Sequence, residues 1–88
     1  MSKQALEQAL HRLRSEVEAL EAGKSEVKGR MTVLIADVEH QLANLDDKRH
    51  RGGLLVRLRA VIGELEAEHP SITEALNRIM NTLSSMGI

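Results

Sequence analysis

The chain has 88 residues and contains no cysteine, phenylalanine, tyrosine or tryptophan. Without cysteine it can form neither disulfides nor thiolate metal sites, which fits a reducing compartment. Without aromatic rings it lacks the platforms that most ligand pockets and single-strand nucleic-acid grooves use. The core must therefore be aliphatic, which favours close packing of helices.

Long apolar runs and a dominant charge are also missing. No stretch approaches the roughly 18 apolar residues of a membrane span, and the residues after Met1 are too polar for a signal peptide. Twelve Lys/Arg face thirteen Asp/Glu, giving a net charge of −1. The total charge therefore does not draw the chain to nucleic acid or to an anionic membrane. We expect one small cytoplasmic domain over residues 1–88 with no membrane partner.

The sequence does contain four segments whose apolar residues recur at spacings of three and four. This spacing places them on one stripe of an α-helix, which must be buried against a neighbour. It predicts an all-α fold of two helical hairpins, with helices at about 2–22, 25–45, 54–68 and 71–86 and bundle or coiled-coil-like packing. The stripes are Leu6, Leu10, Leu13, Val17 and Leu20; Val27, Met31, Leu34, Val38, Leu42 and Leu45; Leu55, Leu58, Ile62 and Leu65; and Ile72, Leu76, Ile79, Leu83 and Met86.

Glycine and proline mark the expected helix ends. Gly23 should end the first helix, and the short connection makes the first two helices antiparallel. Residues 46–53 have no apolar side chain and close with two glycines, which indicates a flexible polar loop, although the two aspartates could instead begin a helical turn. Pro70 should stop the third helix, and Ser71 with Glu74 forms a capping-box pattern. The sequence leaves open whether the last two helices form a hairpin or one bent helix.

Several apolar residues fall outside the stripes. A monomer would expose them as a patch, and a patch of this kind usually marks an interface. A homodimer with two-fold symmetry is the simplest closed arrangement. We therefore predict a homodimer or higher homo-oligomer, acting as a structural or protein-interaction module for an unidentified partner. The interface candidates are Val33, Ile35, Leu54, Val56 and Val61.

A basic cluster offers an alternative function. Lys48, Arg49 and Arg51 could bind a phosphate group or an anionic partner. Asp46 and Asp47 cancel part of this charge, and no aromatic residue is interleaved. Nucleic-acid or anion binding is therefore the weaker hypothesis.

Two histidines that each follow an acid by three residues, His40 and His69, suggest a metal site. Asp37 with His40 and Glu66 with His69 have the spacing that di-iron helical bundles use. A complete site also needs inward-facing glutamates from two further helices, and the glutamates of the first helix lie off its stripe. A metal-binding bundle is therefore the least favoured alternative, and we expect no cofactor.

Catalytic patterns do not emerge from the sequence. Three of the serines, Ser2, Ser25 and Ser71, are explained as helix caps. No Ser-His or Cys-His arrangement typical of nucleophilic catalysis is present. No strand is predicted, so no glycine-rich phosphate loop follows one. The sequence therefore predicts a protein that is not an enzyme.

The C-terminal third carries a resemblance to a known family. The segment EAEHP at 66–70, with its Glu-x-x-His-Pro step, is followed by LNRIMNTLSSMGI at 76–88. Together they resemble the ending of a family of short bacterial proteins catalogued only as a domain of unknown function. Residues 1–53 match it only in their amphipathic helical character. The resemblance implies an all-helical protein with no assigned activity, and it supplies no functional residues.

Overall fold

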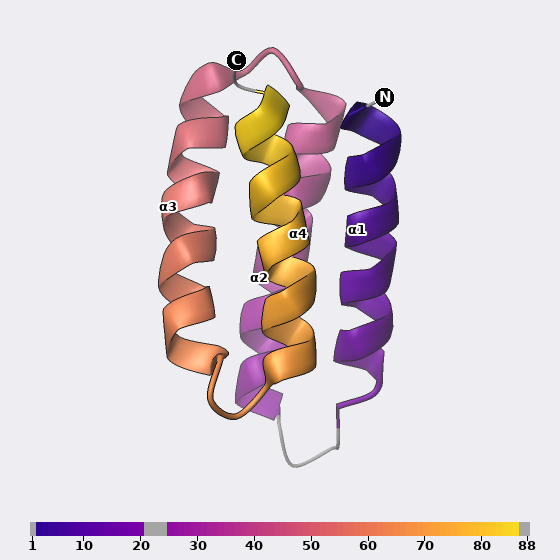
Figure 1. Ribbon diagram of the computed structural model, residues 1–88, viewed down its shortest axis with the longest axis vertical. Coiled ribbons are helices and arrows are strands. Elements are labelled where there is room, and N and C mark those ends of the chain that lie inside the picture. Colours follow the sequence, from indigo (N-terminus) through magenta and orange to yellow (C-terminus); the bar gives the residue numbers. More distant parts are fainter. Residues whose placement is uncertain (1, 21–24, 87–88) are drawn as a thin grey trace.

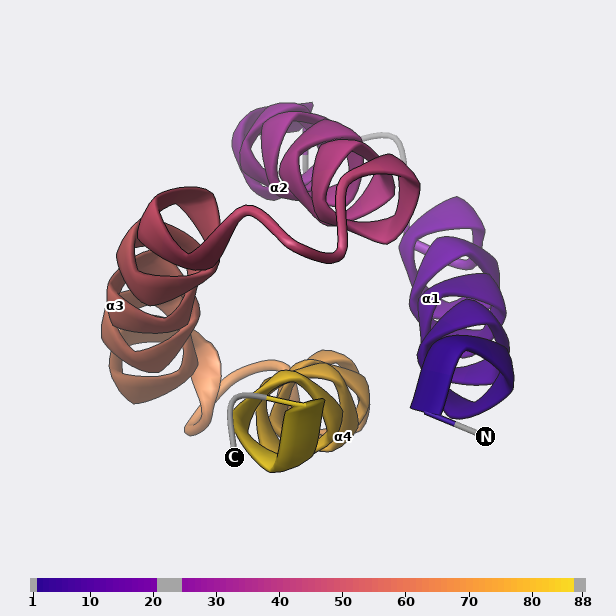
Figure 2. The same cartoon turned by 90° about the horizontal axis from the view of Figure 1, so that it is seen from above.

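The computed structural model describes residues 2–20 and 25–86, and these residues form four α-helices without a strand. They are α1 (Ser2–Glu18), α2 (Ser25–Ala43), α3 (Lys48–Leu65) and α4 (Pro70–Met86). The helices alternate in direction along one long axis (Figure 1). Seen from above, they stand around a shared core in chain order, so that α1 and α4 are also neighbours (Figure 2). The predicted all-α fold of four helices is confirmed.

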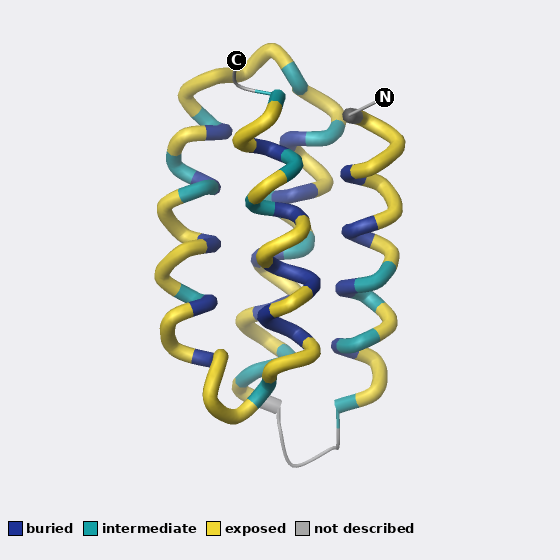
Figure 3. Tube along the Cα trace, in the orientation of Figure 1, coloured by how far each residue is buried: buried dark blue, intermediate teal, exposed yellow. Residues whose placement is uncertain are grey.

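The core is apolar, without aromatic residues, and lies between the four helices. Buried positions face inward on every helix (Figure 3). Helix α4 packs closely on both α1 and α3, whereas α2 and α3 form the loosest neighbouring pair. Burial of a Leu- or Ile-sized side chain stabilises a fold by about 1.5–3 kcal/mol. The buried apolar residues are Leu6, Ala9, Leu10, Leu13, Val17, Met31, Leu34, Val38, Leu54, Leu58, Ile62, Leu65, Ile72, Ala75, Leu76, Ile79 and Leu83.

Helix α3 begins six residues earlier than the sequence predicted, so the expected loop at 46–53 is wrong from Lys48 onward. Asp47 is the N-cap: its carboxylate accepts a hydrogen bond from the His50 backbone N–H at 3.0 Å. The helix then continues through Gly52 and Gly53. Two buried residues, Arg51 and Leu54, lie on the inward side of this stretch, and their burial offsets the cost of helical glycine, about 1 kcal/mol each.

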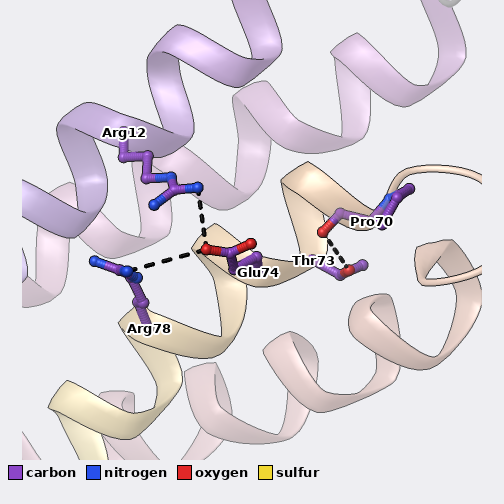
Figure 4. Close-up of polar contacts among 5 residues, drawn as sticks. All are labelled: Arg12, Pro70, Thr73, Glu74 and Arg78. Atoms are coloured by element: carbon purple, nitrogen blue, oxygen red, sulfur yellow. Dashed lines mark hydrogen bonds and ion pairs between the residues drawn. The ribbon is translucent and has the colours of Figure 1, made fainter.

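The last two helices form a hairpin rather than one bent helix, because the chain reverses over residues 66–69 (Figure 1). Pro70 is the first residue of α4, a position that needs no backbone donor. The capping-box prediction is therefore wrong, since Ser71 already lies inside the helix. Thr73 instead donates its hydroxyl to the Pro70 carbonyl at 3.0 Å (Figure 4).

The other helix ends differ from the predictions by a few residues. Helix α1 ends at Glu18 and α2 at Ala43, and the predicted stop at Gly23 lies outside the described residues. Helix α2 is followed by a short connection at 44–47. Terminal turns carry few buried contacts, so apolar spacing alone defines their ends poorly.

Among residues 2–20 and 25–86, ion pairs join three of the four neighbouring helix pairs. Glu74 of α4 accepts from Arg12 of α1 at 3.1 Å, with Arg78 on its other side at 4.0 Å (Figure 4). Arg14 pairs with Glu39 between α1 and α2. These side chains are substantially exposed, so each pair contributes at most about 1 kcal/mol. Core packing therefore holds the bundle together, and the ion pairs add a preference for the correct neighbours.

Two alanine substitutions on α1, one buried and one exposed, test the assigned core. Leu10→Ala removes a side chain that is 2% exposed and should lower the free energy of unfolding by about 2–5 kcal/mol. Glu7→Ala changes an exposed residue on the same helix and should alter it by less than about 0.5 kcal/mol. Urea unfolding followed by circular dichroism measures both. Equal effects of the two substitutions would contradict the assigned core.

Candidate interaction surface

The loosest junction of the bundle, between α2 and α3, contains a groove of about 350 Å³. Leu34 and Val61 form its apolar floor, with Val33 on the α2 side and Ala60 on the α3 side. Two ion pairs cross it. Arg30 pairs with Glu64 towards one end, and Arg57 contacts Asp37 at 3.2 Å towards the other. The groove is therefore a short apolar depression closed at each end by a cross-helix ion pair.

Two valines, one on each of these helices, are strongly exposed. Val33 has 65% of its surface accessible and Val56 has 68%, and they are the only large aliphatic residues in the exposed class within residues 3–20 and 26–86. One belongs to α2 and the other to α3. The two strongly exposed aliphatic side chains thus lie on the two helices that pack least closely together.

The remaining interface candidates are placed differently. Leu54 is completely buried in the core, so its prediction as an interface residue is wrong. It lies in line with Leu58 and Ile62, whereas Leu55, which was predicted for the stripe, is only half-buried. Ile35 and Val61 are half-buried against the core.

Helix α3 carries a second surface on the side opposite its buried stripe. Gly52, Val56, Ala60 and Gly63 recur there at spacings of three and four, and all four are exposed. A Cβ atom built on Gly52 or on Gly63 meets nothing within 4 Å. We call these four residues the α3 outer face. It is small and open, and nothing within the described residues lies over its two glycines.

The charges of α3 are reversed relative to the helix dipole. From Lys48 to Arg59 it carries five Lys/Arg residues and no acid, whereas Glu64 lies in its last turn and Glu66 and Glu68 follow in the turn after it. A helix prefers acidic side chains near its N-terminus and basic ones near its C-terminus. Except for the capping residue Asp47, α3 has the opposite arrangement.

Of the three anion-binding candidates, only two lie on the surface. Lys48 and Arg49 are exposed on the first turn of α3. Arg51 is only 9% exposed and donates from its guanidinium to the Leu45 carbonyl at 3.3 Å. It holds the connection between α2 and α3, so the predicted three-residue basic cluster is not formed.

Beside Arg51 lies a buried polar residue that the sequence analysis missed. Gln41 is fully buried, and its amide donates to the carbonyls of Asn44 at 3.1 Å and Asp47 at 3.4 Å. Its side-chain oxygen lies 2.6 Å from Nδ1 of His50. That oxygen can only accept, so His50 carries its proton on Nδ1. The spacing from Leu34 through Val38 to Gln41 is the stripe spacing, and a glutamine at such a position is the signal that could have revealed the network.

The metal-ligand candidates do not come together. His40 lies near the end of α2, whereas Glu66 and His69 lie in the turn between α3 and α4, at the opposite end of the bundle (Figure 1). Asp37 contacts Arg57, and the His40 ring centroid lies 4.4 Å from that of His50. Among the described residues, no three His, Cys, Asp or Glu side chains form a potential metal cluster.

Comparison with known protein families identifies the family of the chain. Residues 6–88 match a family described as Domain of unknown function (DUF4404). The chain belongs to this family. The predicted relationship to a family catalogued only as a domain of unknown function is thereby confirmed. Comparisons with curated proteins and with solved structures give no match. Within residues 2–20 and 25–86, no helix combines the length and apolarity that crossing a membrane requires.

The buried network around Gln41 makes a measurable prediction. Gln41→Ala leaves the His50 proton and two turn carbonyls without their partner, so it should reduce the free energy of unfolding by about 1–3 kcal/mol. Gln4→Ala makes the same change at an exposed position of α1 and should be nearly neutral. Urea titrations of both variants give the comparison. If the two midpoints coincide, the network does not stabilise the turn.

Proposed function

We propose that this member of the family is a small self-associating helical module with a structural or protein-interaction role, rather than an enzyme. The single observation that supports it best is the exposure of Val33 on α2 and Val56 on α3, two neighbouring helices of the bundle. Water contact with apolar surface is unfavourable, and a clustered apolar surface often marks a site of protein contact.

The groove between α2 and α3 adds to this support. Its floor is apolar, and its ends are closed by charged pairs, so an apolar centre is surrounded by a polar rim. Protein–protein interfaces commonly have this arrangement of apolar core and polar rim. A bundle of this size buries a smaller share of its surface than a larger domain, and association with a second copy adds buried area.

The polar clusters found along the chain are accounted for by the fold. Gln41 and Arg51 organise the connection between α2 and α3, and Glu74 joins α4 to α1. The observations therefore favour association over anion binding through residues 48–51 or metal binding through the acid–histidine pairs.

Sedimentation velocity of the wild-type chain tests the proposal. At about 10 µM, a concentration that populates complexes with micromolar or tighter Kd, the principal species should have twice the chain mass of 9.8 kDa or a higher multiple. Dilution should shift the distribution towards single chains. A lone species of 9.8 kDa at every concentration up to about 100 µM would overturn the proposal.

A further inference from the structure

The self-association proposed above leaves open which surface carries it and in which orientation. We propose that two copies of this chain pair through the α3 outer face, with their α3 helices side by side and antiparallel. The inference rests on the proposed function and adds the contact residues and the geometry.

The charges of α3 select a second copy in this orientation. The exposed Lys48 and Arg49 lie at its start, and the exposed Glu66 and Glu68 lie just beyond its end. Two copies in parallel would set base against base and acid against acid. In an antiparallel pair, Lys48 and Arg49 of each helix lie beside Glu66 and Glu68 of the other, and two-fold symmetry repeats this match at both ends. One surface thus supplies both members of each charge pair.

The same arrangement also compensates for the unfavourable interaction between the charges of α3 and the dipole of that helix. Within one copy, Lys48 and Arg49 lie at the positive N-terminus of α3, and Glu66 and Glu68 lie at its negative C-terminus. In an antiparallel pair, the N-terminus of each α3 lies next to the C-terminus of the other. Lys48 and Arg49 then lie near the negative C-terminus of the other α3, and Glu66 and Glu68 lie near its positive N-terminus. All four charges interact favourably with the helix dipole of the second copy.

The shape of the α3 outer face permits this contact. A two-fold axis between Val56 and Ala60 places each Val56 against Ala60 of the second copy. It also brings each Gly63 towards the Gly52 region of the second copy. The space in front of both glycines is open, so the two backbones can approach closely. The exposed Val33, which lines the adjacent groove together with Ala60, lies beside this contact and extends its apolar area.

A pair of glycine substitutions tests the contact surface. Gly63→Gln puts a long side chain on the α3 outer face, and its Cβ meets nothing within 4 Å in the single chain. The fold should therefore be retained, because glutamine is also the better helix former. The dimer Kd, measured by sedimentation, should rise at least about tenfold. Gly29→Gln makes the same change at an equally open glycine of α2 and should leave the Kd unchanged. An unchanged Kd in Gly63→Gln would overturn the inference.

Charge reversal tests the orientation. One variant combines Lys48→Glu with Arg49→Glu, and a second combines Glu66→Lys with Glu68→Lys. Each reversal improves the match between α3 and its own dipole, so loss of folding is not the expected effect. Each variant alone should dimerise at least about tenfold more weakly than the wild type, whereas an equimolar mixture should restore association as a heterodimer. A parallel pair would not be weakened by either reversal alone.

Controls with the same change of net charge separate this contact from general electrostatic attraction. Lys3→Glu with Lys28→Glu matches the first variant, and Glu7→Lys with Glu18→Lys matches the second, all on α1 and α2. These controls should dimerise as the wild type does. If the wild type dimerises and both charge-reversed variants dimerise equally tightly, the α3 pairing is overturned and the proposed function still stands. A wild type that stays monomeric at all concentrations would overturn both.

Discussion

Burial of one aliphatic stripe from each helix is the interaction on which the other features depend. Because the chain has no aromatic residue, its core consists of leucine, isoleucine, valine, alanine and one buried methionine. Each of these side chains fills little volume, so the helices must approach closely for the core to be dense. The cross-helix ion pairs are exposed, and their combined contribution is small beside that of the buried stripe. The stripe thereby fixes which side of every helix remains outside.

On α3 this constraint has two results. Turning Leu54, Leu58 and Ile62 inward places Val56 and Ala60 on the opposite side, where a second molecule can reach them. Turning Arg51 inward sets its guanidinium beside the connection at 44–47, where it binds a backbone carbonyl. A buried polar group needs such a partner. The outer face of α3 and the ordered connection before it therefore follow from the same rotation of one helix.

The sequence was sufficient to predict the class of fold and the number of helices, because three-four spacing is a strong constraint on which residues share a face. It was less informative about single positions. Leu54 and Leu55 are adjacent and equally apolar, and only packing against α4 and α2 decides which of them is buried. Gly52 and Gly53 suggested a loop because local propensity disfavours helix there, yet the Asp47 cap and the burial of Arg51 overcome that cost.

The candidate surface was predicted only in part. Val33 and Val56 were identified because they are apolar residues outside the stripes, and the structure exposes them. The groove beside them depends on how tightly α2 packs on α3, which is set by side-chain volumes across the whole bundle. Gln41 was missed because the stripe was continued from Val38 to Leu42, one position further along, instead of to a polar residue. Apolar periodicity thus shows which faces are hidden but not how closely two hidden faces meet.

The burial of Met31 has a consequence for observing the protein in solution. Its side chain is completely enclosed by the core, whereas Met80 and Met86 are half-buried at the edge. Peroxide oxidises a thioether only where it can reach the sulfur. The rate at which peroxide oxidises Met31 therefore reports how often the helices separate. Met31 is thus an intrinsic probe for opening of the bundle, and Met80 and Met86 provide an internal comparison.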